Sequence, residues 1–344
     1  MNRLPGPFGP PLGQARIKQR PEDFRVRECL GFEPAGQGEH LLIRVEKTAM
    51  TTPELIEAVA ASVGIHPRQV GHAGLKDRQA VTEQWLSLQM PGCKTMPAEF
   101  FESPESPQWR VLEAHWHDRK LRVGAHRGNA FEVLLRDVTA EPEALFARIE
   151  RLREQGFANY FGAQRFGRDG DNVAQALRIL NDPRRRKRLS RTRRSLYLSA
   201  LRSELFNRIL ARRIEADAWF APLPGDVWML DGSGSWFAEP LDATLRQRHA
   251  RGDIHSGIRL HGRGQPPMCD EALALEQSVL ADCREITDTL ERLDTRLALR
   301  PHRALPRDLE VEWRPEQKQL LLRVTLGKGS YLTALLIQLL DIES

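Results

Sequence analysis

One short polar stretch of the sequence combines a carboxylate with two cations in a way that could support catalysis. Residues 71–80 read Gly-His-Ala-Gly-Leu-Lys-Asp-Arg-Gln-Ala, so Asp77 stands between Lys76 and Arg78. Positive neighbours favour the ionised form of a carboxyl group. An ionised, oriented carboxylate can act as a nucleophile or as a general base. A solvated turn aspartate is the simpler alternative, because aspartates are common in turns.

Two further clusters mix aromatic side chains with amides and arginines. Residues 127–131 read Arg-Gly-Asn-Ala-Phe, and residues 159–167 read Asn-Tyr-Phe-Gly-Ala-Gln-Arg-Phe-Gly. An exposed aromatic ring can stack on a nucleobase while an amide hydrogen-bonds to the edge of that base. The same side chains would also suit a hydrophobic core or a packed domain junction, so both interpretations stay open.

Positive charge is concentrated in one segment. The chain has 51 lysines and arginines against 46 aspartates and glutamates, a net charge of +5, and residues 184–194 hold basic side chains without a single acidic one. Such a block repels itself unless an anion lies nearby, and guanidinium groups bind phosphate oxygens well. The segment therefore favours a nucleic-acid-binding surface over a solvated, partly disordered loop. Its densest run is Arg184, Arg185, Arg186, Lys187 and Arg188.

Motifs of several common enzyme classes are absent from the sequence. It contains no phosphate-binding loop, no dinucleotide-binding G-x-G-x-x-G after a strand, and no serine or cysteine nucleophile elbow. His115 and His117 have no third metal ligand nearby, so we expect exposed strand residues there. Four scattered cysteines suit a reducing compartment and argue against a zinc site. We therefore expect neither a metal nor a cofactor.

The elements that must position these clusters predict an α+β fold with an antiparallel or mixed sheet. Thr52 and Pro53 fit the N-cap and first residue of a helix that Gly64 can end. Strands return after a long central excursion, so the middle of the chain is expected to be inserted into a domain built from both ends. Expected strands are 24–27, 41–45, 81–88, 131–138, 309–313 and 319–326, with a hairpin at 228–237. Expected helices are 143–155, 198–213, one or two over 271–297, and an apolar one from Tyr331.

Length and composition are those of a folded protein with more than one domain. The chain has 344 residues, of which 41% are hydrophobic and 28% are charged. No run approaches the ~18 apolar residues that a membrane span needs, and the first residues show no apolar signal segment. We expect a cytoplasmic protein without a membrane partner. We also expect a monomer, because no coiled-coil heptad or apolar edge strand stands out.

Taken together, the clusters resemble the TruD family of tRNA pseudouridine synthases, which isomerise uridine 13 of certain transfer RNAs. The matches follow the family's order over nearly the whole chain, and the run at 159–167 is the most specific. After Gly329-Ser330-Tyr331 the family pattern continues with Ala, Thr and a later Arg, whereas Leu332, Thr333 and Ile337 stand here. The other matches are Pro21-Glu22-Asp23-Phe24, Ala73-Gly74-Leu75-Lys76-Asp77, Lys120-Leu121-Arg122, the cluster at 127–131, and residues 198–203 with Leu205-Phe206-Asn207.

The resemblance implies the pseudouridine synthase fold, a mixed and largely antiparallel sheet with flanking helices, carrying an inserted α+β TRUD domain. The catalytic domain would comprise residues 1–156 and 304–344, and the insertion residues 157–303. Asp77 matches the catalytic aspartate. The uridine pocket matches Phe24, Asn129 and Tyr331, and other active-site neighbours match Lys18, Glu22, Lys76, Phe131 and Gln164.

The implied isomerisation breaks the C1′–N1 bond of uridine, turns the base and joins C1′ to C5, without cofactor or metal. Asp77 would attack C1′ to give a covalent adduct or remove the C2′ proton to give a glycal, and the residues leave both routes open. Arg165 and the arginine block would hold the tRNA backbone. The alternative is a non-catalytic RNA-binding protein that assists tRNA folding; intact Asp77, Asn129 and Phe24 favour the enzyme.

Overall fold

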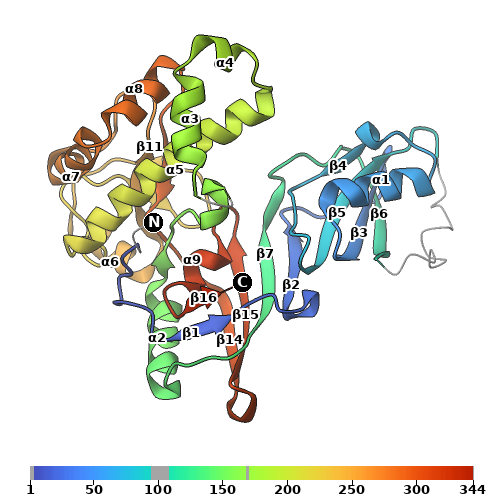
Figure 1. Ribbon diagram of the computed structural model, residues 1–344, viewed down its shortest axis with the longest axis horizontal. Helices are drawn as coiled ribbons and strands as arrows, with labels where there is room; N and C mark the ends of the chain where they lie inside the picture. Colours follow the sequence, from blue (N-terminus) through green and yellow to red (C-terminus); the bar gives the residue numbers. More distant parts are fainter. Residues whose placement is uncertain (1–3, 94–107, 168–169, 344) are drawn as a thin grey trace. The chain divides into compact units, whose positions relative to one another are not determined.

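The computed structural model describes residues 4–93, 108–167 and 170–343. The chain divides into two compact units, each of which combines helices with strands (Figure 1). Unit 1 comprises Met1–Leu12, Pro142–Leu305 and Ser330–Leu340, and unit 2 comprises Gly13–Glu141, Pro306–Gly329 and Asp341–Ser344. The expected boundaries of the inserted domain, 157 and 303, come from the family resemblance, whereas the two units are divided by their compactness. These boundaries stay a prediction.

Unit 2 is built on an eight-stranded sheet in the described part of the chain. Its strands run in the order β14-β15-β7-β2-β5-β3-β6, and β4 also pairs with β5. The pairings are antiparallel except for the parallel pair β2–β5. The strands are β2 (Phe24–Leu30), β3 (His40–Thr48), β4 (Val70–His72), β5 (Val81–Gln89), β6 (Trp109–His117), β7 (His126–Leu135), β14 (Arg307–Arg314) and β15 (Gln319–Gly327), and a short parallel pair joins β1 (Gln14–Arg16) to β16 (Asp341–Glu343).

Helix α1 (Thr52–Ser62) packs on one face of this sheet (Figure 1). Leu55 and Val59 of the helix are fully buried in a cluster with Leu41 and Ile43 of β3. The N-cap is Thr51 rather than the expected Thr52, because Thr51 and Glu54 form a reciprocal capping box. The Thr52 hydroxyl is therefore free to point inward, a placement that matters for the candidate active site.

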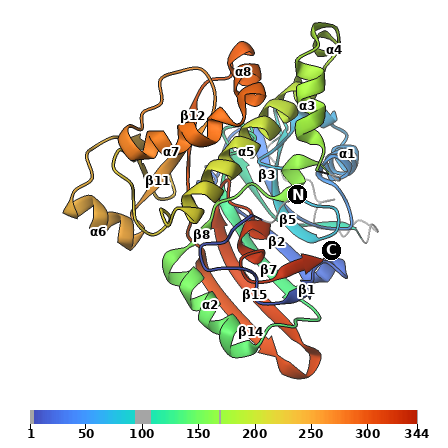
Figure 2. The ribbon, with the colours of Figure 1, turned by 60° about the vertical axis from the view of Figure 1, so that its left-hand side comes forward.

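Unit 1 surrounds the long helix α5 (Arg191–Glu215), which contacts α3, α7, α8 and strand β11 (Figure 2). A four-stranded sheet in the order β10-β9-β11-β12 and a pair β13-β8 complete the unit among the described residues. Its helices are α2 (Pro142–Gln155), α3 (Asn172–Leu180), α4 (Pro183–Lys187), α6 (Ala243–Arg251), α7 (Asp270–Ala281), α8 (Arg284–Arg292) and α9 (Leu332–Leu336). Its strands are β8 (Phe157–Ala158), β9 (Trp228–Leu230), β10 (Trp236–Phe237), β11 (Ile254–Leu260), β12 (Ala298–Pro301) and β13 (Arg303–Ala304).

Several predicted elements are confirmed with shifted ends that have identifiable causes. The strand expected at 131–138 covers 126–135, since its pairing with β2 already includes His126 opposite Leu30, and the positive φ of Asp137 follows its end. Helix α5 starts before residue 198, because the Ser190 hydroxyl caps it. The expected exposure of His117 is wrong. Its ring is buried and stacks on Phe32 at 4.9 Å.

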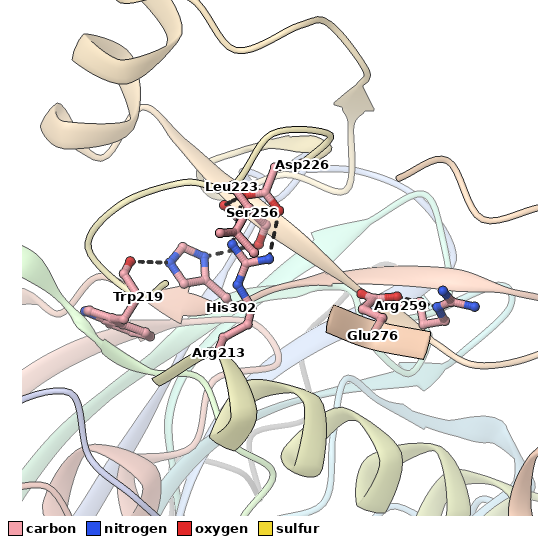
Figure 3. A network of polar contacts seen from close by, with 8 residues as sticks. All are labelled: Arg213, Trp219, Leu223, Asp226, Ser256, Arg259, Glu276 and His302. Atoms are coloured by element: carbon pink, nitrogen blue, oxygen red, sulfur yellow. Dashed lines mark hydrogen bonds and ion pairs between the residues drawn. The ribbon is translucent and has the colours of Figure 1, made fainter. Parts of the chain in front are cut away.

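A buried ion pair joins α5 to the loop before β9 in unit 1 (Figure 3). Arg213 Nη1 and Nη2 each lie 2.8 Å from an oxygen of Asp226, and both side chains are almost fully buried. Asp226 also accepts hydrogen bonds from the Ser256 hydroxyl (2.7 Å) and the Leu223 amide (2.9 Å). The carboxylate is thus fully partnered only while Arg213 is present.

We expect Arg213→Met to lower the free energy of unfolding by about 3–5 kcal/mol, because it leaves the buried Asp226 carboxylate without its counter-charge. The neighbouring Arg212→Met is the control. Arg212 forms an exposed pair with Glu215 at 3.9 Å, so its removal should cost less than about 1 kcal/mol. Urea unfolding followed by circular dichroism measures both. Equal effects of the two substitutions would contradict the role given to the buried pair.

Candidate active site

Asp77 lies in the segment 73–80, which joins β4 to β5 without regular secondary structure. Its carboxylate is 59% exposed, and Lys18 Nζ lies 2.7 Å from Asp77 Oδ2. The same ammonium lies 4.2 Å from the centre of the Phe24 ring. Lys18 therefore joins the carboxylate to an aromatic face through an ion pair and a cation–π contact. This arrangement leaves part of an ionised carboxylate open to a ligand.

The neighbours of Asp77 do not supply its counter-charge, contrary to the sequence-based interpretation. Lys76 forms an ion pair with Glu28, and Arg78 lies 3.5 Å from Glu54. The cation that contacts Asp77 is Lys18, which is distant in the sequence. Spacing along the chain could not reveal this partner, because the contact exists only once the chain after β1 and the segment 73–80 are folded together.

Hydrogen bonds on both sides of Asp77 fix its backbone. Lys47 Nζ donates to the carbonyl oxygen of Asp77 at 2.9 Å, and the Lys76 amide donates to the Thr52 hydroxyl at 2.9 Å. Arg78 Nε donates to the carbonyl oxygen of Ala49 at 3.2 Å. A segment without strand or helix partners thus has polar backbone groups satisfied by side chains.

The ammonium of Lys47 is buried beneath this segment. Burial lowers the pKa of Lys47 from 10.5 to about 8, although the negative charge of Asp77 opposes the shift and the charge of Lys76 adds to it. Lys47 lies on β3, opposite Thr82 of β5. Because its ammonium is buried and donates to the carbonyl oxygen of Asp77, Lys47 supports the Asp77 backbone rather than acting as a surface cation.

Strand register brings Phe24, Asn129 and Phe131 to one face of the sheet. Phe24 pairs with Val133, Val26 with Phe131, and Glu28 with Asn129, and residues on alternate positions share a face. The rings of Phe24 and Phe131 lie 6.2 Å apart at 67°. Asn129 Oδ1 is buried, and no hydrogen bond to it is found within the described residues. An unpartnered buried acceptor can receive a donor from a ligand.

In unit 1, Arg165 Nη2 donates to Tyr331 Oη at 2.5 Å. The Arg165 guanidinium also lies 5.6 Å from the Phe161 ring, whose centre is 5.9 Å from that of Tyr331. Buried Arg300 stacks on Phe161 at 4.1 Å, and burial lowers its pKa to about 10. Residues 159–167 thus include buried aromatic side chains and two more accessible polar ones, since Gln164 is exposed and Arg165 is half-buried.

The arginine block is helical, so the loop interpretation is wrong. Asp182 caps α4 and Ser190 caps α5, and the first turn of α5 holds Arg191, Arg193 and Arg194 without an acidic residue. A helix N-terminus is already positive, so three cations there are unfavourable unless an anion binds. Within the block, Arg186 is half-buried and the other basic side chains are exposed.

Two positions singled out from the sequence, Glu22 and Ile337, are exposed. The exposed Glu22 side chain has no ion pair or hydrogen bond among the residues that the structure describes. Ile337 ends α9 and is 36% exposed.

No group of three or more His, Cys, Asp or Glu side chains in the described ranges could hold a metal ion. The helices of the described part include none long and apolar enough to cross a membrane.

Comparison with known proteins gives one consistent result. The family model of tRNA pseudouridine synthase D (TruD) matches residues 11–182 and 170–339. The chain is 41% identical to tRNA pseudouridine synthase D of Methylococcus capsulatus, over 99% of this chain and 95% of the relative. It is 40% identical to the protein of that name from Xanthomonas axonopodis pv. citri, over 98% and 95%.

A solved structure supports the fold independently. The chain superimposes on a crystal structure from Methanosarcina mazei that carries the TruD designation, with a TM-score of 0.73 and 20% identity, over 95% of this chain and 93% of the other. The expected pseudouridine synthase fold, with its largely antiparallel sheet, is thereby confirmed.

We expect the stability contribution of Lys47 to rise with pH. Between about pH 8 and 10.5 the folded protein releases the Lys47 proton while the unfolded chain retains it, so the unfolded state binds more protons and stability increases with pH. The free energy of unfolding of the wild type, minus that of Lys47→Met, should therefore grow from pH 7.5 to 9.5. A difference that stays constant or falls in urea titrations would contradict the lowered pKa.

Proposed function

The chain belongs to the TruD family of tRNA pseudouridine synthases, and we propose that it isomerises uridine 13 of transfer RNA to pseudouridine, with Asp77 as the catalytic carboxylate and without a cofactor. One observation carries this proposal: the Asp77 carboxylate is partly exposed while its backbone is held by Lys47. The same carboxylate forms an ion pair with Lys18, whose ammonium also contacts the Phe24 ring. A carboxylate in this state can react at a sugar carbon that is brought to it.

The reaction requires only rearrangement within one nucleotide. The bond between C1′ and N1 breaks, the uracil turns, and C1′ bonds to C5; C5 then loses its proton and N1 gains one, so that the product is an isomer. Asp77 either bonds to C1′ in a transient adduct or accepts the C2′ proton in a glycal route. Both routes need an ionised carboxylate close to the ribose.

Recognition of uracil follows from the sheet face beside Asp77. The unpartnered Asn129 Oδ1 can accept the N3–H of uracil, which cytosine lacks at that position. The half-buried Phe131 ring, which packs against the buried Phe24 ring, offers apolar surface to a base that has left its stack, and this contact offsets part of the unstacking cost of a few kcal/mol. These contacts would favour uracil over cytosine in the same pocket.

The cations of unit 1 suit the phosphate backbone of tRNA. Exposed arginines of α4 and α5 present guanidinium groups near two helix N-termini. Such contacts do not depend on the RNA sequence, and they weaken as the salt concentration rises. We assign Gln164, Arg165 and Tyr331 to contact with the same RNA, and we propose a monomer that works in the cytoplasm.

A non-catalytic role in tRNA folding is the second candidate. It would use the same cationic surface but would not need an ionised carboxylate in a fixed position. The anchoring of Asp77 by Lys47, Thr52 and Lys18 favours the enzyme.

We expect Asp77→Asn to abolish pseudouridine formation and to leave tRNA affinity nearly unchanged, because the amide keeps the shape of the side chain but is neither a nucleophile nor a base. Purified protein is added to tRNA from a strain that lacks it, and pseudouridine is mapped by carbodiimide-dependent reverse-transcription stops. Asp137→Asn, an exposed aspartate after β7, is the control. Near wild-type activity of Asp77→Asn would refute the catalytic role, and a stop at another uridine would refute position 13.

We expect the double variant Arg184→Gln and Arg188→Gln to bind tRNA more weakly and with a flatter salt dependence. The plot of log K for tRNA binding against log salt concentration has a negative slope. This slope should become less steep by about 1 for each phosphate that the variant no longer neutralises. The matched control is Arg246→Gln with Arg251→Gln, two exposed arginines of α6 in the same unit. Filter binding over a salt series measures both. An unchanged slope for the first pair would show that the arginine block does not contact RNA.

A further inference from the structure

Glu28 on β2 is a buried carboxylate that the proposed reaction does not use directly. Its side chain is 0% exposed, and it forms an ion pair with Lys76, whose side chain is 7% exposed. Lys76 directly precedes Asp77 in the chain. Because its ammonium is turned inward and covered, Lys76 is poorly placed to neutralise an RNA phosphate. Its charge instead serves a contact inside the protein.

The second oxygen of Glu28 binds the backbone of β5. Glu28 Oε1 accepts a hydrogen bond from the Trp85 amide at 3.2 Å. The parallel pairing of β2 with β5 extends only to Arg27 and Glu83, so the carboxylate satisfies an amide beyond the end of that pairing. Glu28 therefore connects the central sheet, through Lys76, to the segment that carries Asp77.

Two other strands hold the same segment. Gln84 Oε1 on β5 accepts a hydrogen bond from the Thr52 hydroxyl at 3.0 Å, and that hydroxyl accepts one from the Lys76 amide. Lys47 on β3 donates to the carbonyl oxygen of Asp77. The backbone is thus tied near β3 and β5, and Glu28 is the anchor for the Lys76 side chain.

The net stability that such a pair supplies does not explain its presence. Burying two charges costs several kcal/mol each in desolvation, and an apolar pair of similar volume is often as stable. A buried pair does, however, disfavour every loop conformation that would separate its charges. The geometry of the pair suits a device that selects one conformation of residues 73–80.

We propose that Glu28 is a positioning residue, which fixes Lys76 and thereby holds the Asp77 carboxylate at the productive distance from the ribose. This inference rests on the proposed function, because it assumes that Asp77 performs the chemistry. Glu28 itself does not touch the substrate in this proposal. Its removal should consequently affect the chemical step rather than RNA binding.

The first test is Glu28→Gln, which removes the charge and keeps the shape. Under single-turnover conditions with saturating tRNA, the rate of pseudouridine formation should fall by about 10²-fold, the effect of a misplacement of about 1 Å, while Kd for tRNA stays unchanged. Hydrogen exchange of residues 73–80 should become faster. Glu83→Gln is the matched control, since Glu83 is a strand carboxylate of β5 that pairs with Arg44 instead. It should retain the wild-type rate.

The second test is a double-mutant cycle with Lys76→Met. If the two side chains act as one unit, the double variant should be no slower than the slower single variant. Independent rate reductions that multiply in the double variant would overturn the proposal, as would an unchanged rate or a raised Kd with an unchanged rate. Should Glu28→Gln fail to fold, the double variant Glu28→Gln with Lys76→Met carries the test, because it removes both charges and leaves neither of them unpaired in the interior.

The outcomes also separate this inference from the proposed function. A wild-type protein that forms no pseudouridine refutes the proposed function, and hydrogen exchange in Glu28→Gln then still tests whether Glu28 orders residues 73–80. An active wild type with an equally active Glu28→Gln refutes the positioning role alone.

Discussion

The candidate active site depends on how a segment without secondary structure is held on a sheet. Residues 73–80 form neither a strand nor a helix, so hydrogen bonds to buried side chains help to fix their position. Lys47, Thr52 and Glu28 supply these bonds from β3, from the start of α1 and from β2. The register of β2, β3 and β5 consequently determines where the Asp77 carboxylate lies.

The local parts of this arrangement could be predicted from the sequence, and the long-range parts could not. The strands, the end of the first helix at Gly64 and a polar turn around Asp77 can be predicted from residues that are adjacent in the sequence. The Lys18–Asp77 pair joins residues 59 positions apart, and no periodic pattern encodes it. Glu28 was missed for the same reason. It reads as one polar residue in a strand, although its place between Val26 and Leu30 on a face with buried apolar residues was a usable signal.

Family resemblance filled part of this gap, but it did not supply the contacts. It singled out Lys18 and Lys76 together, although their ammonium groups have different partners: Asp77 for Lys18 and Glu28 for Lys76. In unit 1 it marked Arg165 and Tyr331, which hydrogen-bond to each other. The arginine block was predicted from charge alone, whereas its helical form follows from the Asp182 and Ser190 caps. Asp182 followed by Pro183 was a usable signal for a helix start, of the same kind as Thr52 followed by Pro53.

The position of β7 inside the sheet, between β15 and β2, has a consequence for synthesis of the protein. β7 pairs with β2 on one side and with β15 on the other, and residues 136–318 must be made between β7 and β15. During that interval one edge of β7 has no native partner, and open strand edges invite pairing with other chains. We therefore expect the nascent chain to need protection at this edge until residue 327 has left the ribosome, and truncations that end within 136–318 to aggregate.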